Sequence, residues 1–212
     1  GPFASLNLRD GLGDDANVVA HNRRIVADAI GAAPVYLDQV HGCAVVRLSA
    51  ADLRPGAPVH VADASVTTEP GIACAVQVAD CLPVLFAAPQ ARAVGAAHAG
   101  WRGLAGGVLE AALAAVCDAA SCEPRDVRTW LGACIGPDAF EVGADVLAAF
   151  DAAPGSPRFK PRAPGKWLAD LPALARDRLR AAGVAEIGGG RWCTVSDASR
   201  FFSFRRDRLT GR

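Results

Sequence analysis

Two histidines and one cysteine in this sequence are of the types that hold a catalytic metal. They are His41, Cys81 and His98, and each is followed within about two residues by a glycine or proline, near the end of an apolar stretch. Neutral imidazole and thiolate are ligands for zinc, and three protein ligands leave the fourth position open for chemistry. The spacing is too long for a zinc finger, so the chain fold must bring the three together. We predict that they bind a metal ion and take part in catalysis.

Each of these residues also has a simpler interpretation. A histidine followed by glycine, as at His41, is common in turns where the backbone satisfies the ring. A cysteine at the end of a buried strand, as at Cys81, is commonly a small packed thiol in an intracellular protein. The same three residues without a metal would suit a cysteine hydrolase, with Cys81 as the nucleophile and a histidine as the base.

Two carboxylates accompany the predicted ligands. Asp80 directly precedes Cys81, and a carboxylate is costly to bury without a partner. We therefore assign Asp80 a catalytic role, as a proton shuttle. Asp63 is the alternative for that role, and we also count it among the substrate-binding candidates.

Two arginines are candidates for binding an anionic group. Arg102 follows His98 in a Gly-rich segment that leads into a predicted helix, where backbone N–H groups and a guanidinium suit phosphate. A surface arginine after a tight turn is the alternative. Arg206 follows a run of aromatic residues, and it fits either an arginine clamp or an ordinary solvated charge cluster. We predict that both arginines bind substrate.

Mixed helices and strands must position these residues. Predicted helices cover residues 16–30, 104–120, 138–150 and 168–182, and predicted strands cover 35–40, 44–48, 72–78, 83–87, 93–97, 127–131 and 192–195. Residues 52–60 and 153–164 read as loops, 188–190 as a flexible turn, and the aromatics at 201–204 as a buried strand. Because the predicted strands and helices do not alternate strictly, we predict an α+β fold with mixed sheets packed centrally and helices outside.

Composition limits the class of protein. The chain has 212 residues, 51% of them hydrophobic, and a formal net charge of zero, which fits one domain with a sizeable core. Neither nucleic acid nor a membrane is an expected partner. The seven cysteines are an odd number and several lie in apolar runs, which indicates reduced thiols in a cytoplasmic protein. The absence of methionine suggests a domain truncated at both ends. A monomer is the default expectation.

Longer blocks in the sequence resemble a known family. The most specific are Ala79-Asp80-Cys81-Leu82-Pro83 and His98-Ala99-Gly100-Trp101-Arg102-Gly103. Further matching blocks lie within residues 1–8, 22–24, 39–42, 62–64, 67–71, 84–85, 136–143, 193–194 and 201–212. Together they resemble the YfiH-like laccase-domain family, also called multicopper polyphenol oxidoreductases and purine nucleoside phosphorylases, over essentially the whole chain.

The resemblance implies a metal at His41, Cys81 and His98, zinc with copper as the alternative. It also implies an α/β/β/α layered fold likened to cysteine hydrolases. The implied activities are phosphorolysis of adenosine, inosine, guanosine and methylthioadenosine, and deamination of adenosine, so the expected partners are a purine nucleoside and phosphate. Copper-dependent polyphenol oxidation and a cysteine-type hydrolase that edits peptidoglycan precursors are the alternatives that the family suggests.

Overall fold

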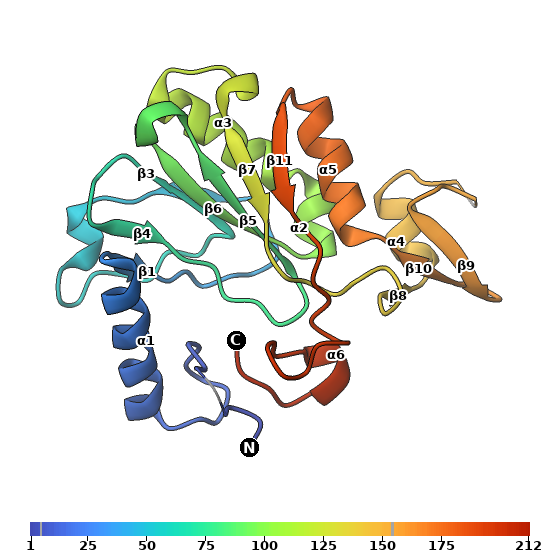
Figure 1. The fold of residues 1–212 in the computed structure, drawn as a ribbon, viewed down its shortest axis with the longest axis horizontal. Coiled ribbons are helices and arrows are strands. Elements are labelled where there is room, and N and C mark those ends of the chain that lie inside the picture. Colours follow the sequence, from blue (N-terminus) through green and yellow to red (C-terminus); the bar gives the residue numbers. More distant parts are fainter. Residues whose placement is uncertain (5, 154) are drawn as a thin grey trace.

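A six-stranded mixed sheet forms the centre of the molecule in a computed structural model (Figure 1). The structure describes residues 1–4, 6–153 and 155–212, so Ser5 of the first family block and Pro154 of the predicted 153–164 loop lie outside the described residues. The strands of the six-stranded sheet run in the order β11-β7-β5-β6-β3-β2. Their bounds are β2 Val45–Arg47, β3 Ala64–Thr67, β5 Leu82–Ala87, β6 Val94–Ala99, β7 Arg128–Leu131 and β11 Glu186–Gly189.

Two smaller sheets flank the central one. In the first, β1 (Ala33–Val35) pairs in parallel with β4 (Ile72–Cys74). In the second, β10 (Lys166–Ala169) pairs with both β8 (Glu141–Val142) and β9 (Phe159–Ala163) in antiparallel fashion. Figure 1 shows this second sheet projecting at the right-hand side of the molecule.

Helices surround the sheets. They are α1 Ala16–Ile30, α2 Trp101–Gly106, α3 Val108–Ala120, α4 Ala144–Ala149, α5 Leu171–Ala181 and α6 Phe204–Asp207, with short 3-10 helices at Ala50–Leu53, Pro89–Ala91 and Pro124–Asp126. Helix α3 packs against β3 and β6, and α5 lies beside α3. The buried residues of α3 recur at helical spacing and include Val108, Leu109, Ala112, Leu113 and Val116, which form one face against the sheet.

The mixed α+β prediction is confirmed, with strands and helices close to many of the predicted positions. The predicted helix 104–120 is in fact two helices, because Gly107 adopts a left-handed φ of 99° and separates α2 from α3. The loop expected at 153–164 instead contains β9, whose partner β10 follows after a tight turn at Gly165. The likeness to cysteine hydrolases stays a prediction.

The C-terminal part of the chain departs most from the sequence-based expectations. The strand expected at 192–195 is reduced to an isolated bridge between Cys193 and Cys134, whereas the expected turn at 188–190 belongs largely to β11. The aromatic run at 201–204 is not a strand. Ser203 caps α6, because its side chain accepts a hydrogen bond from the backbone N–H of Arg206.

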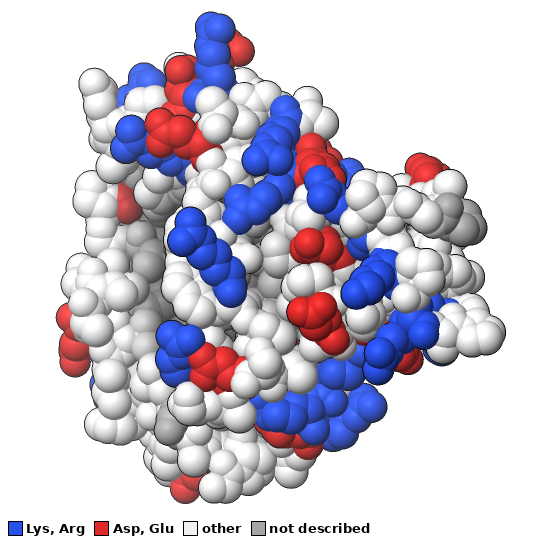
Figure 2. Space-filling view, turned by 45° about the vertical axis from the view of Figure 1, so that its right-hand side comes forward, with Lys and Arg blue, Asp and Glu red and all other residues white. Residues whose placement is uncertain are grey.

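Charges of both signs are interspersed on the face of the molecule drawn in Figure 2, in keeping with a formal net charge of zero. Among the helices of the described residues, none combines the length and apolar character that crossing a bilayer requires.

Candidate metal centre and its cavity

Three strand ends meet where the predicted ligands lie. Strand β6 is antiparallel to both β5 and β3, so it ends at the edge of the sheet where they begin. His98 lies near the end of β6 and pairs with Pro83, while Cys81 directly precedes β5. Asp63 directly precedes β3, and its backbone carbonyl accepts a hydrogen bond from the His98 N–H at 2.7 Å. His41 reaches this edge from the loop before β2.

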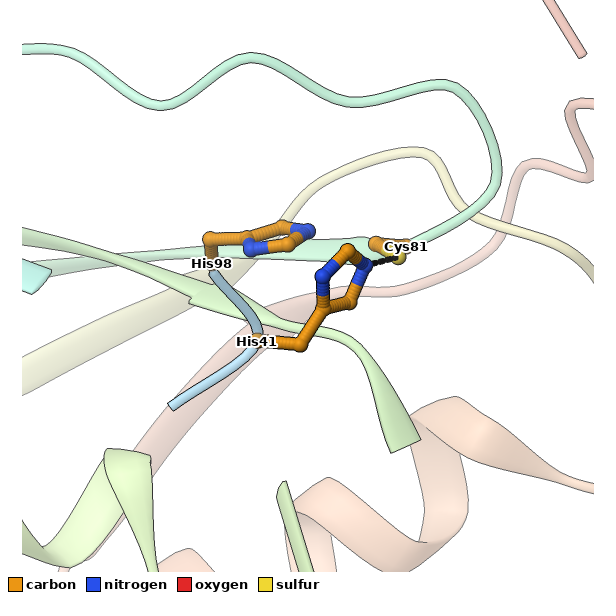
Figure 3. A group of neighbouring side chains, drawn as sticks. All are labelled: His41, Cys81 and His98. Atoms are coloured by element: carbon orange, nitrogen blue, oxygen red, sulfur yellow. Dashed lines mark hydrogen bonds between the residues drawn. The ribbon is translucent and has the colours of Figure 1, made fainter. Parts of the chain in front are cut away.

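The side chains of His41, Cys81 and His98 converge on one point, as Figure 3 shows. Their potential ligand atoms all lie within 4.8 Å of one another. The Cys81 Sγ and His41 Nε2 atoms are 3.7 Å apart, and the two imidazole rings meet edge to face with centroids 4.7 Å apart. The tertiary structure therefore brings together three residues that are far apart in the chain.

Asp63 lies behind this group and organises it. Its side chain is completely buried, and it accepts hydrogen bonds from the backbone N–H groups of Val40, His41 and Gly42 at 3.2, 2.8 and 2.6 Å. It also accepts one from His98 Nδ1 at 2.8 Å. The carboxylate thus holds a turn in which His41 adopts a left-handed φ of 62°, a conformation that is uncommon for a non-glycine residue.

Hydrogen bonding keeps Asp63 ionised despite its burial. Burial by itself would raise the pKa of Asp63, but the hydrogen bonds from His98 and from the turn outweigh it and leave the pKa below its usual value. Burial lowers the pKa of His98, an effect that Asp63 opposes, and the lowered pKa favours the neutral ring. A neutral ring that donates Nδ1–H to a carboxylate leaves Nε2 free to bind a metal.

Burial also governs the Cys81 thiol. It raises the pKa of Cys81 to about 12, and the adjacent Asp80 carboxylate adds to this shift. A thiolate at this position therefore requires a nearby cation. Two imidazoles and a cysteine form a donor set that fits zinc or another borderline-soft divalent ion, and the Asp63 carboxylate orients one of the imidazoles from behind.

Glycines allow the close packing around the ligands. A Cβ atom at Gly100 would lie 2.7 Å from Cδ2 of His41 and 3.1 Å from Sγ of Cys81. A Cβ atom at Gly103 would lie 2.9 Å from the carbonyl oxygen of Gly42. The glycines of the His-Ala-Gly-Trp-Arg-Gly block therefore make room for the His41 turn.

Asp80 directly precedes Cys81, but its side chain is hydrogen-bonded to the C-terminal part of the chain. Its carboxylate accepts hydrogen bonds from Thr194 Oγ1 and from the Arg205 backbone N–H, both at 2.6 Å. Its backbone has a φ of 98°, and its carbonyl accepts a hydrogen bond from the Ile135 N–H. Asp80 thereby joins the Cys81 segment to the C-terminal part of the chain. The Thr194 partnership was not part of the sequence-based expectation.

The structure does not bring the two predicted anion-binding arginines into the metal centre. Arg102 is exposed on the short helix α2, and its guanidinium lies 4.3 Å from the centre of the Trp101 ring. Arg206 pairs with Asp207 and donates to the backbone carbonyls of Thr194, Val195 and Phe201. Neither of them is among the residues that line the cavity beside the metal centre, and Asp63 and Asp80 do not line it either.

That cavity has a volume of about 350 Å³ and opens beside the three predicted ligands. Besides these ligands its wall contains Arg9, Leu12, Gln39, Gln77, Val78, Ala79, Phe204 and Arg212. Sequence reasoning had assigned no role to Arg9, Gln77, Phe204 or Arg212. The family blocks at the two ends of the chain include Phe204 and Arg212 and adjoin Arg9, but only the fold places the two ends against the same cavity.

Comparisons with known proteins agree with the sequence resemblance. The family model described as multi-copper polyphenol oxidoreductase laccase matches residues 1–212. The chain is 47% identical to a Pseudomonas aeruginosa protein and 46% identical to YfiH of Escherichia coli, and both relatives are named purine nucleoside phosphorylase. Each alignment covers the whole of this chain, together with 84% of the Pseudomonas protein and 85% of the Escherichia coli protein.

Solved structures also resemble the fold. A Neisseria meningitidis protein of the DUF152 family superposes with a TM-score of 0.91 at 45% identity, and YlmD of Geobacillus stearothermophilus with 0.92 at 36%. Both matches cover the whole of this chain and 85% and 84% of those chains. This chain therefore belongs to the YfiH-like family, whose model is described as multi-copper polyphenol oxidoreductase laccase.

Proposed function

We propose that the protein is a metal-dependent purine nucleoside phosphorylase whose active centre is the His41, Cys81 and His98 group. The observation that carries the proposal is the convergence of these three donors, backed by buried Asp63, on a cavity of about 350 Å³. That volume lies within the range of about 300–1,000 Å³ that is typical of small-molecule sites. The names of the relatives at 46–47% identity support the reaction class.

In the proposed reaction, a phosphate oxygen forms a bond to ribose C1′ while the bond from C1′ to the purine nitrogen breaks. The electron pair of that bond goes to the purine, which takes up a proton from solvent. The products are the free base and the sugar 1-phosphate, which is ribose 1-phosphate for the three ordinary nucleosides and 5-methylthioribose 1-phosphate for methylthioadenosine. When bound, zinc supplies Lewis-acid polarisation of a substrate atom. Adenosine, inosine, guanosine and methylthioadenosine are the proposed substrates.

The residues of the cavity suit such a substrate. Phe204 lies in the cavity wall and is 46% exposed, so it adds aromatic surface for a purine beside the Arg212 guanidinium, which lies 5.6 Å from its ring centre. Gln39 and Gln77 hold each other, because the Gln77 N–H donates to Oε1 of Gln39 and Nε2 of Gln39 donates to the Gln77 carbonyl. In this proposal Asp63 and Asp80 are positioning residues, since hydrogen bonds within the protein occupy their oxygens.

We propose deamination of adenosine as a second reaction of the same centre. An activated water that attacks the purine C6 replaces the amino group by oxygen and releases ammonia, which is the chemistry of other zinc deaminases. Because it consumes water and not phosphate, this reaction is separable from phosphorolysis by its products and its cosubstrate.

Metal analysis and product analysis on the same preparation test the proposal. The protein is purified without added metal, its metal content is measured by mass spectrometry, and it is incubated with adenosine with and without phosphate. Adenine and ribose 1-phosphate formed only with phosphate support phosphorolysis, and inosine supports deamination. In His41→Ala we expect metal and both activities to be lost together.

The alternatives predict different results. Bound copper and oxygen-dependent oxidation of a phenol, without nucleoside turnover, would favour a polyphenol oxidase. Rapid labelling of Cys81 by iodoacetamide in an active, metal-free protein would favour a cysteine hydrolase. Nucleoside cleavage that survives complete removal of metal would contradict the metal-dependent mechanism.

A further inference from the structure

Two arginines from opposite ends of the chain face the metal-site cavity. Arg9 lies near the N-terminus and Arg212 is the last residue of the sequence, and both line the cavity that His41, Cys81 and His98 also line. Figure 1 shows the two ends of the chain lying near each other below the central sheet. The cavity is therefore lined both by the candidate metal ligands and by a pair of cationic side chains.

One buried asparagine holds the backbones of both arginines. Oδ1 of Asn7 accepts hydrogen bonds from the N–H of Arg9 at 3.2 Å and from the N–H of Arg212 at 3.0 Å. Nδ2 of Asn7 donates to the carbonyl oxygen of Arg9 at 3.1 Å. The Leu8 N–H in turn donates to the Arg212 carbonyl at 2.9 Å. The fold thus holds the backbones of the two arginines close to each other.

Further contacts fix this segment to the rest of the cavity wall. Nε2 of Gln77 donates to the Leu8 carbonyl at 2.5 Å, and Nδ2 of Asn22 donates to the Asn7 carbonyl at 2.9 Å. A Cβ atom at Gly211 would lie 2.7 Å from the Phe202 ring and 3.0 Å from Asn7, so the chain end packs tightly here. Ordering of this kind before a ligand arrives lowers the entropic cost of binding it.

Among the described residues, the two arginines lack carboxylate partners in direct contact. Nη1 of Arg212 donates to the Gly211 carbonyl at 3.2 Å, and its guanidinium lies 5.6 Å from the centre of the Phe204 ring. In the part of the chain that the structure describes, neither guanidinium forms an ion pair with a carboxylate, and no Asp or Glu lines the cavity. Burial lowers the pKa of Arg212, and the nearby positive charge of Arg9 lowers it further. The surface shown in Figure 2 is different, because cations and carboxylates are interspersed there.

We propose that Arg9 and Arg212 form a subsite for a phosphoryl oxyanion, and that inorganic phosphate is its occupant. Two half-buried, like-charged guanidinium groups without acidic partners favour a multivalent anion, and planar guanidinium groups match the geometry of phosphate oxygens. The inference rests on the proposed function, because it makes the cavity the place where phosphate meets the nucleoside. It replaces Arg102 and Arg206 as the phosphate-binding residues.

Calorimetric titration of the metal-containing protein with inorganic phosphate tests the subsite without any turnover. We expect Arg9→Gln and Arg212→Gln each to weaken phosphate binding by about 10- to 100-fold, as expected for a charge-assisted hydrogen-bonded contact. Exposed Arg180→Gln is the matched control and should bind like the wild type. Arg102→Gln is the competing variant, also expected to bind like the wild type. Metal content and thermal melting of every variant show whether its fold is intact.

Kinetics on the same variants give a second readout. With nucleoside in excess, both cavity arginine variants should raise the KM for phosphate by a similar factor, with Arg9→Lys intermediate, and any deamination of adenosine should persist because it uses no phosphate. Unchanged phosphate binding in both folded variants, or a loss confined to Arg102→Gln, would overturn the subsite.

Two further outcomes separate the subsite from the proposed reaction. Phosphate binding that depends on both arginines, in a protein that cleaves no nucleoside, would uphold the subsite and contradict the phosphorylase proposal. Adenosine 5′-monophosphate presents the same oxyanion as an ester, so it serves as the second ligand. Its binding through the two arginines, with no binding of inorganic phosphate, would overturn phosphate as the occupant.

Discussion

The carboxylate of Asp63 accepts a hydrogen bond of 2.8 Å from Nδ1 of His98, and both side chains are buried. An ionised carboxylate cannot donate, so the proton of the neutral ring lies on Nδ1 and the lone pair on Nε2. The same carboxylate holds the turn that carries His41. Asp63 therefore orients two of the three predicted ligands, although it is not itself a predicted ligand.

Asp63→Asn tests this orienting role. The amide is neutral, and its NH2 group can face Nδ1 and disfavour the required tautomer, so we expect metal affinity to fall by about 10- to 100-fold. Competition with a chromophoric chelator measures the affinity. Exposed Asp28→Asn is the matched control. Wild-type affinity in a folded Asp63→Asn protein would show that the carboxylate does not orient the ligands.

Gly100→Ala tests the close packing at the centre. The new methyl group would meet His41 and Cys81 at 2.7 and 3.1 Å, so we expect the ligands to be displaced and metal content to drop. Gly95→Ala is the matched control, because its methyl group would meet Val116 at 2.9 Å in the core, away from the ligands. Overpacking of this kind costs about 1–3 kcal/mol of stability in both variants. Equal metal content in the two would contradict the prediction.

Thr194→Val tests the link between Asp80 and the C-terminal part of the chain. Loss of the 2.6 Å hydrogen bond leaves a carboxylate oxygen without its donor, and we expect the free energy of unfolding to fall by about 1–3 kcal/mol. Urea denaturation measures the change. Thr194→Ser retains the hydroxyl, so it should keep most of the wild-type stability. If Thr194→Ser is as unstable as Thr194→Val, the loss of stability comes from packing and not from the hydrogen bond.

Asp52 gives a prediction for the acid range. A hydrogen bond from His60, with another from the Ser49 backbone N–H, lowers the pKa of Asp52 below its usual value. A lowered folded-state pKa adds stability above the unfolded-state pKa, and this stability disappears as the pH falls through the folded-state pKa. Asp52→Asn should therefore destabilise the protein at neutral pH and flatten its loss of stability below about pH 4.

Thermal melting from pH 2 to 7 measures both effects for Asp52→Asn. The matched control is the exposed Asp28→Asn variant, which should follow the wild-type profile. Identical acid profiles for wild type and Asp52→Asn would contradict the assignment of the shift to this carboxylate.

The sequence by itself determined which residue types were available for a metal and which local elements would carry them. Helix α1 was predicted with its observed bounds, because Asp15 caps its start and Gly31 ends it in a left-handed conformation. Apolar runs likewise predicted β5 and most of β6, which deliver Cys81 and His98. These features depend on near neighbours in the chain, so a linear pattern reveals them.

Only the tertiary structure decided how the cavity is built. Strand order at one sheet edge placed Asp63 behind His98, and hydrogen bonds across nearly the whole chain length, such as that from the Arg212 N–H to Asn7, placed the two ends together. The same packing left Arg102 on the surface. Contacts between residues so far apart depend on strand pairing and loop closure, which leave no local periodicity in the sequence. For that reason the sequence could single out the three candidate ligands and Asp63, whereas Arg9, Gln77, Phe204 and Arg212 became candidates only from the fold.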